Sequence, residues 1–110
     1  MTGGGKSYWD NGNIEYEGIF LNGLKECLDK KGYYYFKDGT LQYCGYWLRN
    51  RRTGQGVAFY DNQQKLYEGE WKDDEWNGTG MRYSKTGDCI SEGVWEMGRL
   101  VQDFRRTPKK

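Results

Sequence analysis

The sequence contains no histidine, one proline and few aliphatic side chains among its 110 residues. Without an imidazole, histidine-containing zinc fingers and Ser-His or Cys-His nucleophile systems are excluded. No run of about 18 apolar residues is present, so no transmembrane helix is expected, and no apolar segment follows Met1, so no signal peptide is expected. The three cysteines, Cys27, Cys44 and Cys89, include no CxxC pair, and their odd number favours a reducing, cytoplasmic compartment over a disulfide framework.

The charged side chains nearly balance, with 17 Lys and Arg against 16 Asp and Glu. Nucleic-acid-binding domains usually carry a basic excess, so no nucleic-acid partner is expected. The segment Gly3–Ser7 resembles part of a phosphate-binding loop, but it lacks the earlier glycine, the buried strand and the helix that such a loop needs. The sequence also shows no paired nucleophile and base and no metal-ligand cluster. It therefore predicts no catalytic residue, no metal site and no cofactor, and a chain that is not an enzyme.

Glycine and aromatic residues are present in excess, at 17 glycines and 17% aromatic residues, whereas average glycine usage is about 7%. An aromatic-x-Gly-x-aromatic motif starts at Tyr16, Tyr43 and Tyr67, and a variant of it starts at Ser91. Eleven residues before each start lies a glycine, and three residues after that glycine lies an aromatic residue. This two-part pattern extends over almost the whole chain and is typical of a repeat protein.

Each repeat has room for two short strands joined by turns. In the segment YEGEW, Tyr67, Gly69 and Trp71 alternate with glutamates, which is the two-residue period of a β-strand. The segments between the strands carry turn residues, so each repeat is predicted to form a β-hairpin. Stacked hairpins would align the rings in three columns: Tyr16, Tyr43 and Tyr67; Phe20, Trp47, Trp71 and Trp95; and Tyr8, Tyr35, Phe59 and Tyr83.

These motifs resemble the MORN repeat (membrane occupation and recognition nexus), whose pattern is YxGxW followed by glycines, GxGxxxY and a DG-type turn. Residues 67–90 fit the pattern best, and the resemblance covers about residues 3–100. It implies an all-β fold: an elongated, twisted, single-layer antiparallel sheet of tandem β-hairpins. It also implies a scaffold or targeting module for protein–protein interaction or membrane-proximal tethering, as in ciliary, cytoskeletal and membrane-junction proteins.

The repeats predict one domain over residues 1–104, followed by a basic tail at 105–110. The domain divides into a half repeat at 1–15, repeats that start at 16, 43 and 67, and a partial repeat from 91. About three extra residues within the segment LKECLDKKG predict one longer hairpin loop. Asn50 and Asp74 stand where the family usually has glycine, but both residue types tolerate the left-handed conformation that such turns need.

The end of the array departs further from the pattern. The last unit is expected to lack its second strand, and the segment VQDF follows instead. Leu100, Val101 or Phe104 is expected to fold back over the final hairpin, because the ends of repeat arrays are commonly atypical caps.

The first functional hypothesis is a non-catalytic protein-binding scaffold. An aromatic groove would take a partner helix or peptide, because Trp and Tyr are favoured at binding hot spots. The predicted groove residues are Tyr43, Trp47, Tyr67, Trp71 and Trp95. The same rings can instead form the core of a sheet that has few aliphatic residues, and the free sheet edges could pair with a second copy.

The alternative hypothesis is a peripheral membrane tether that binds anionic phospholipid headgroups through basic side chains. Arg49, Arg51 and Arg52 are expected in one hairpin loop, and Arg105 and Arg106 in the tail. For both hypotheses the expected location is cytoplasmic, in a cytoskeletal, ciliary or membrane-peripheral assembly.

Overall fold

The computed structural model describes residues 2–104, so the predicted basic tail lies outside the described residues. Within residues 2–104 the chain forms ten strands and no helix, so none of these residues belongs to a helix that could cross a membrane. The strands are β1 (Thr2–Tyr8), β2 (Ile14–Leu21), β3 (Leu24–Lys25), β4 (Cys27–Tyr35), β5 (Leu41–Leu48), β6 (Arg51–Phe59), β7 (Lys65–Lys72), β8 (Glu75–Tyr83), β9 (Cys89–Glu96) and β10 (Arg99–Asp103).

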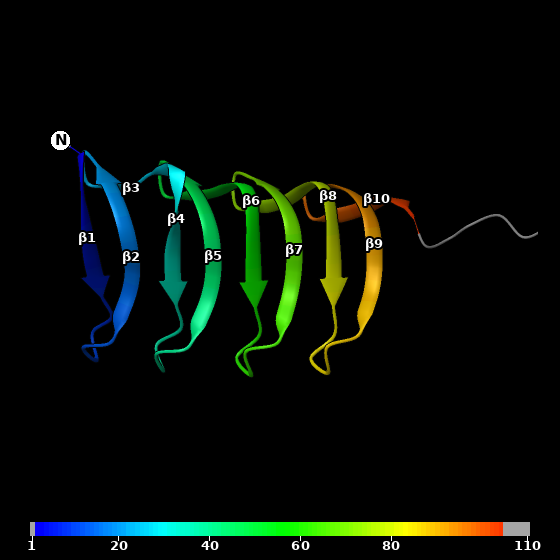
Figure 1. The fold of residues 1–110 in the computed structure, drawn as a ribbon, viewed down its shortest axis with the longest axis horizontal. Coiled ribbons are helices and arrows are strands. Elements are labelled where there is room, and N and C mark those ends of the chain that lie inside the picture. The colour runs from blue at the N-terminus through cyan, green and yellow to red at the C-terminus, as the bar shows by residue number, and fades with distance from the viewer. Residues whose placement is uncertain (1, 105–110) are drawn as a thin grey trace, which may run out of the picture.

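All ten strands belong to one antiparallel sheet whose order follows the chain. The order is β1-β2-β4-β5-β6-β7-β8-β9-β10, and the short β3 pairs with β2. Figure 1 shows the strands side by side in one row, with turns along its upper and lower edges. The predicted fold class, an all-β single-layer sheet of consecutive hairpins, is therefore confirmed.

Paired glycines let aromatic rings lie directly on this sheet. Gly69 faces Gly80 across β7 and β8, and Gly45 faces Gly56 across β5 and β6. A Cβ atom on Gly80 would overlap the ring of Tyr67. Because glycine has no side chain, the ring occupies the space above the pair.

The upper edge carries two-residue turns in which both central residues have positive φ, which is the type I′ geometry of tight hairpins. These turns lie at residues 22–23, 49–50, 73–74 and 97–98. Asn50 and Asp74 have φ of 70° and 71°. The prediction that they adopt the left-handed conformation in place of glycine is therefore confirmed.

The lower edge carries four five-residue loops of one design, at residues 9–13, 36–40, 60–64 and 84–88. In each loop the first residue donates a backbone hydrogen bond to the fifth and accepts one from the fourth. The fourth residue has positive φ and is glycine in three loops, whereas Gln63 adopts a φ of 71° in the other. Side chains tie neighbouring loops together: Asn62 donates to the Lys85 carbonyl, for example.

The extra residues after Lys25 do not lengthen a hairpin loop, so that prediction is wrong. The hairpin turn is the tight one at 22–23, and the insertion lies within the next strand. Cys27 pairs with Trp47 and the following pair is Gly32 with Gly45, so residues 28–31 interrupt the ladder as a bulge. There is room for them because the C-terminal end of β2 pairs with β3 rather than with β4.

The last repeat has a second strand, which corrects the prediction that it lacks one. β10 pairs with β9, and Leu100 faces Trp95 before a bulge at Val101. Leu100 packs against the core, whereas Val101 and Phe104 are 48% and 43% exposed. Of the three candidates, Leu100 therefore covers the final hairpin.

The core lies on one face of the sheet, which we call the ring face. Its buried side chains are Tyr16, Cys27, Tyr43, Trp47, Ala58, Tyr67, Trp71 and Trp95. The third predicted column lies on the opposite, back face. Tyr83 shows why: it follows Arg82, which pairs with Tyr67, and successive strand residues point to opposite faces.

Candidate functional site

The five predicted groove residues lie in the core rather than on an open surface. Tyr43 and Tyr67 are 0% exposed, Trp47 is 3% exposed, and Trp71 and Trp95 are 4% exposed. Their prediction as a partner-binding groove is corrected accordingly, because rings packed this closely hold the sheet together. Trp47 and Trp71 do reach hollows of the ring face, where they contribute to the floor.

Edge-to-face contacts bury these rings. The centroid of Tyr43 lies 5.2 Å from that of Trp47 and 5.1 Å from that of Trp71, and both pairs are T-shaped, an arrangement that aromatic quadrupoles favour. The Tyr43 hydroxyl donates to the Tyr46 carbonyl at 3.1 Å, and Trp71 Nε1 donates to the Gly56 carbonyl at 3.1 Å. Burial raises the pKa of Tyr43 well above its ordinary range and that of Tyr67 to about 12.

A second row of side chains, which we call the cap row, lies over the rings. Its members are the fifth residues after Phe20, Trp47, Trp71 and Trp95, namely Lys25, Arg52, Trp76 and Leu100. The Arg52 guanidinium lies 4.9 Å from the Trp71 ring centroid, and Trp76 stacks on Tyr67 at 4.6 Å. Lys25 lies over the rings of Tyr16, Tyr34 and Trp47.

Asp74 fixes Arg52 in this position. Its Oδ1 accepts from the Arg52 backbone amide at 2.7 Å and from Nε at 2.9 Å. The charge of Arg52 is thus paired beside the aromatic rings, where its guanidinium also makes cation–π contacts.

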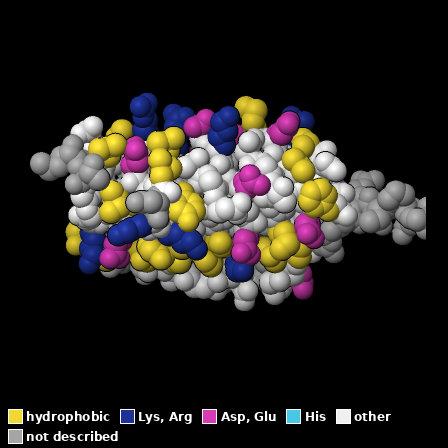
Figure 2. Space-filling view, turned by 45° about the horizontal axis from the view of Figure 1, so that its top comes forward, with side chains coloured by type: hydrophobic (Ala, Val, Ile, Leu, Met, Phe, Trp, Pro, Cys, Tyr) yellow, Lys and Arg dark blue, Asp and Glu magenta, His cyan; other side chains and the backbone are white. Residues whose placement is uncertain are grey.

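The three arginines expected in one basic loop do not share a surface, which corrects that prediction. Arg49 lies in the turn, whereas Arg51 and Arg52 begin β6 and, as successive strand residues, point to opposite faces. Arg51 lies 4.0 Å from Asp73. Figure 2, with the turn edge tipped forward, shows basic and acidic side chains interspersed. Arg105 and Arg106 lie outside the described residues.

The larger of the two hollows on the ring face includes Ala58 in its lining and has a volume of about 450 Å³. Ala58 faces both Tyr43 and Tyr67 across the sheet. Tyr34 and Arg82 hold the equivalent positions in the neighbouring repeats. A methyl group thus stands where the neighbouring repeats carry a large side chain, and this difference opens the hollow.

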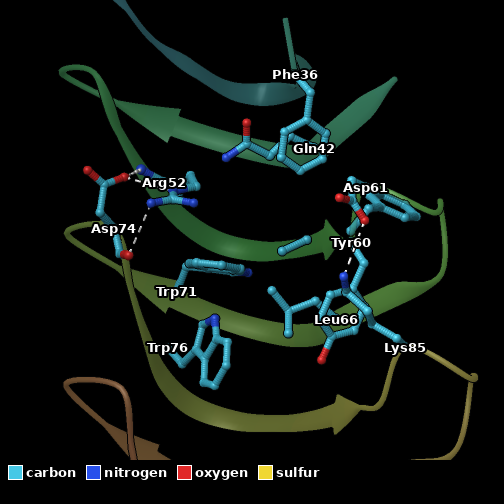
Figure 3. Close-up of a pocket in the computed structure, with 12 residues that line it drawn as sticks. Phe36, Gln42, Arg52, Tyr60, Asp61, Leu66, Trp71, Asp74, Trp76 and Lys85 are labelled. Carbon is cyan, nitrogen blue, oxygen red and sulfur yellow. Dashed lines mark hydrogen bonds and ion pairs between the residues drawn. The ribbon is translucent and has the colours of Figure 1, made fainter. Parts of the chain in front are cut away.

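Figure 3 shows how the hollow is bounded. Its apolar lining includes Phe36, Leu66, Trp71 and Trp76. The Arg52–Asp74 pair lies at one side, and the Asp61–Lys85 ion pair, at 3.5 Å, lies at the other.

Bulges bring two further side chains to the hollow. Leu66 and Gln42 each lie in a register shift, between a pair on the ring face and a pair on the back face. Such a bulge re-aims the extra side chain, and both residues line the hollow. The side chain of Gln42 makes no hydrogen bond within the described part of the chain, so its amide is available to a ligand.

This arrangement is suited to binding a large apolar side chain. Its volume falls in the range of roughly 300–1,000 Å³ that is usual for ligand sites, and its apolar lining with a few polar groups is usual as well. Among residues 2–104, no group of three or more His, Cys, Asp or Glu side chains is placed to hold a metal ion.

Sequence reasoning missed the residues that shape the hollow, Ala58 and Trp76 above all. The cap row could have been found from the repeat, because its members keep a fixed spacing after the motif. The importance of Ala58 could have been noticed as a small residue between Tyr34 and Arg82 in the alignment of repeats. The bulges at Gln42 and Leu66 had no signal of their own in the sequence.

Comparison with known proteins gives two matches. The family model described as MORN repeat matches residues 16–26, 43–65 and 67–89. MORN repeat-containing protein 3 of Xenopus laevis is 37% identical to this chain over 60 residues, which are 50% of the chain and 25% of the relative. The match thus spans a quarter of that relative's length. Repeats of this kind are commonly involved in protein or membrane interactions.

Proposed function

The chain belongs to the MORN-repeat family, and on that premise we propose that it is a non-catalytic protein-binding module. Its contact surface is the ring face, and its anchor site is the hollow at Ala58. We expect the partner in the cytoplasm, in a cytoskeletal, ciliary or membrane-associated assembly, as the family resemblance implies.

One observation carries this proposal. The ring face has two hollows: the one at Trp47 is smaller and lined mainly by polar and charged side chains, whereas the one at Ala58, where a methyl group replaces a large side chain, has a mostly apolar lining. Binding energy concentrates where one large side chain enters a well-formed pocket surrounded by weaker contacts. A partner helix or peptide that places an aromatic or aliphatic residue between Leu66 and Trp76 would use the site in this way.

Two matched variants test the proposal. Ala58→Tyr fills the hollow with the residue that the preceding repeat carries at Tyr34. Val57→Tyr adds the same side chain to the back face, where the preceding repeat carries Tyr33; both Val57 and Tyr33 face Cys44. Each new ring therefore has a precedent in this sheet, and both variants are expected to fold.

Affinity purification from native cells is then compared for the three chains. We expect at least one protein to be retained by wild type and Val57→Tyr and lost by Ala58→Tyr. Retention of every captured protein by Ala58→Tyr would contradict the proposed use of the hollow. If captured proteins were lost only with Val57→Tyr, binding would lie on the back face, which would also contradict the proposal. Circular dichroism and thermal melting confirm folding.

The lipid-tether alternative lacks an observation of equal weight in residues 2–104. Arg52 is paired with Asp74 on the ring face, and Arg51 lies on the other face near Asp73. The described part of the chain thus presents no continuous basic surface made of the three arginines.

A further inference from the structure

We propose that the segment bound by the ring face is acidic, with carboxylates on both sides of the apolar residue that enters the hollow. This inference rests on the proposed function and names the chemistry of its partner. It is carried by the placement of unpaired cations around the hollow.

Two cations near the hollow have no acidic partner among the described side chains. Arg82 lies on the ring face opposite Tyr67, and its side chain makes no ion pair, hydrogen bond or ring contact with any described side chain of residues 2–104. Lys25 lines the smaller hollow at Trp47, where it lies over aromatic rings and has no described carboxylate within salt-bridge distance. An acidic group brought to either cation therefore gains a new ion pair without breaking an existing one.

The two faces of the sheet differ in their charges. The charged strand residues of the ring face are Arg52 and Arg82 on its middle strands, Lys25 beside β2, Glu15 on β2 and Asp103 on β10. The back face carries Glu17, Glu68 and Glu92 in one row across the sheet, together with Lys6 opposite Glu17 and Lys65 paired with Glu68. Arg82, the cation nearest the hollow that has no acidic partner within residues 2–104, is thus on the ring face, and it favours an acidic segment there.

The spacing of the cations restricts where the carboxylates lie. Arg82 is two strands from Ala58, or about 10 Å, and Lys25 lies a similar distance beyond Arg52 in the cap row. An extended segment covers about 10 Å in roughly three residues, and a helix covers it in roughly seven. An acidic residue is expected at this separation from the anchor residue on the Arg82 side, and at a larger separation on the Lys25 side, because Lys25 lies beyond Arg52.

A random peptide library displayed on phage tests the inference with the full chain. Peptides are selected on wild type, and those that also bind Ala58→Tyr are removed. If Ala58→Tyr fails to fold, Ala58→Arg takes its place, because Arg82 shows that the sheet accepts an arginine at the equivalent position. We expect the remaining peptides to combine a large apolar residue with an excess of Asp and Glu. Synthetic copies are expected to bind Lys25→Gln and Arg82→Gln about two- to fivefold more weakly each, as for exposed ion pairs.

Lys6→Gln is the matched control, because Lys6 is an exposed cation on the back face opposite Glu17; it should leave peptide affinity unchanged. Hollow-dependent peptides without an acidic excess, or with affinities insensitive to both ring-face variants, would overturn the inference and leave the proposed function standing.

Two other occupants of the ring face would give distinct results, and either result would contradict both the proposed function and the acidic-segment inference. One is the absence of hollow-dependent peptides together with a wild-type dimer that Ala58→Tyr dissociates, which would assign the hollow to a second copy. The other is the absence of such peptides together with sedimentation on phosphatidylserine vesicles that Lys25→Gln and Arg82→Gln reduce.

Discussion

Tyr67 shows how much a single residue contributes in a sheet with so few aliphatic side chains. Its ring lies over the Gly69–Gly80 pair, contacts Trp71 and Trp95 edge-on, and stacks on Trp76. Its hydroxyl donates to the Glu70 carbonyl at 3.0 Å. Burial of the polar group is tolerated because this bond satisfies it.

The buried tyrosines predict a loss of stability at alkaline pH. Burial raises the pKa of Tyr67 from 10.0 to about 12, and it also raises the pKa values of Tyr16 and Tyr43. Between about pH 10 and 12 the unfolded chain releases protons that the folded chain keeps, so stability is full below about pH 10 and falls as pH rises above it.

Thermal melting over a pH series, with tyrosinate absorbance recorded in parallel, checks this expectation. Tyr67→Phe removes one of the three groups and should make the melting temperature fall less steeply above about pH 10. An unchanged slope in that variant would contradict the role given to Tyr67.

At the scale of elements, the type I′ turns do more than reverse the chain. Asp74 accepts hydrogen bonds from the backbone and side chain of Arg52 in the preceding hairpin, and Asn50 accepts one from the Lys25 amide at 2.8 Å. At the last turn Gly98 has no side chain to do so, although its amide donates to the Trp76 carbonyl. Asn and Asp therefore add side-chain hydrogen bonds between successive hairpins to the backbone bond that glycine also makes.

Asp74→Gly is predicted to destabilise the protein by about 1–2 kcal/mol, because glycine keeps the turn and its backbone bonds to Arg52 but removes the two side-chain bonds. Asp74→Asn should cost less, since an amide oxygen can still accept from the Arg52 backbone, as Asn50 does for Lys25. Urea denaturation measures both. Equal stability of wild type and Asp74→Gly would show that relief of the positive φ offsets the lost bonds.

At the scale of the whole molecule, each hairpin is stabilised mainly by its immediate neighbours. Contacts between elements are concentrated between adjacent strands of the sheet, and the cap row and rings interlock from one repeat to the next. Stability in such an array is approximately a sum of unit and interface contributions.

This organisation predicts that damage stays local. At the N-terminal end of the core, the ring centroids of Phe20 and Tyr16 lie 5.1 Å apart. Phe20→Ala should lower the free energy of unfolding by about 2 kcal/mol, which is less than the loss for a fully buried Phe because Phe20 is partly exposed. Amide hydrogen exchange is expected to accelerate in β1, β2 and β4 while β8 and β9 keep their protection. Uniform acceleration over the whole sheet would show global cooperativity instead.

Several features of the site were beyond sequence reasoning for one physical reason. The period of two assigns Tyr67 and Trp71 to a common face, but it does not say what covers that face. Their burial depends on Trp76 and Arg52, which come from the strands after the turns. Whether Arg51 or Arg52 shares the face of the rings likewise depends on cross-strand register.

The sequence by itself determined the repeated hairpin, the tight turns and the aromatic nature of the core, because each follows from residues close together in the chain. Strand alternation, turn residues and the positions of glycine are local properties. The tertiary structure alone decided which rings are buried, where the bulges place Gln42 and Leu66, and why the ring face opens at Ala58. These features arise from pairing between strands, where the partner of a residue lies elsewhere in the chain, as Ala58 pairs with both Tyr43 and Tyr67.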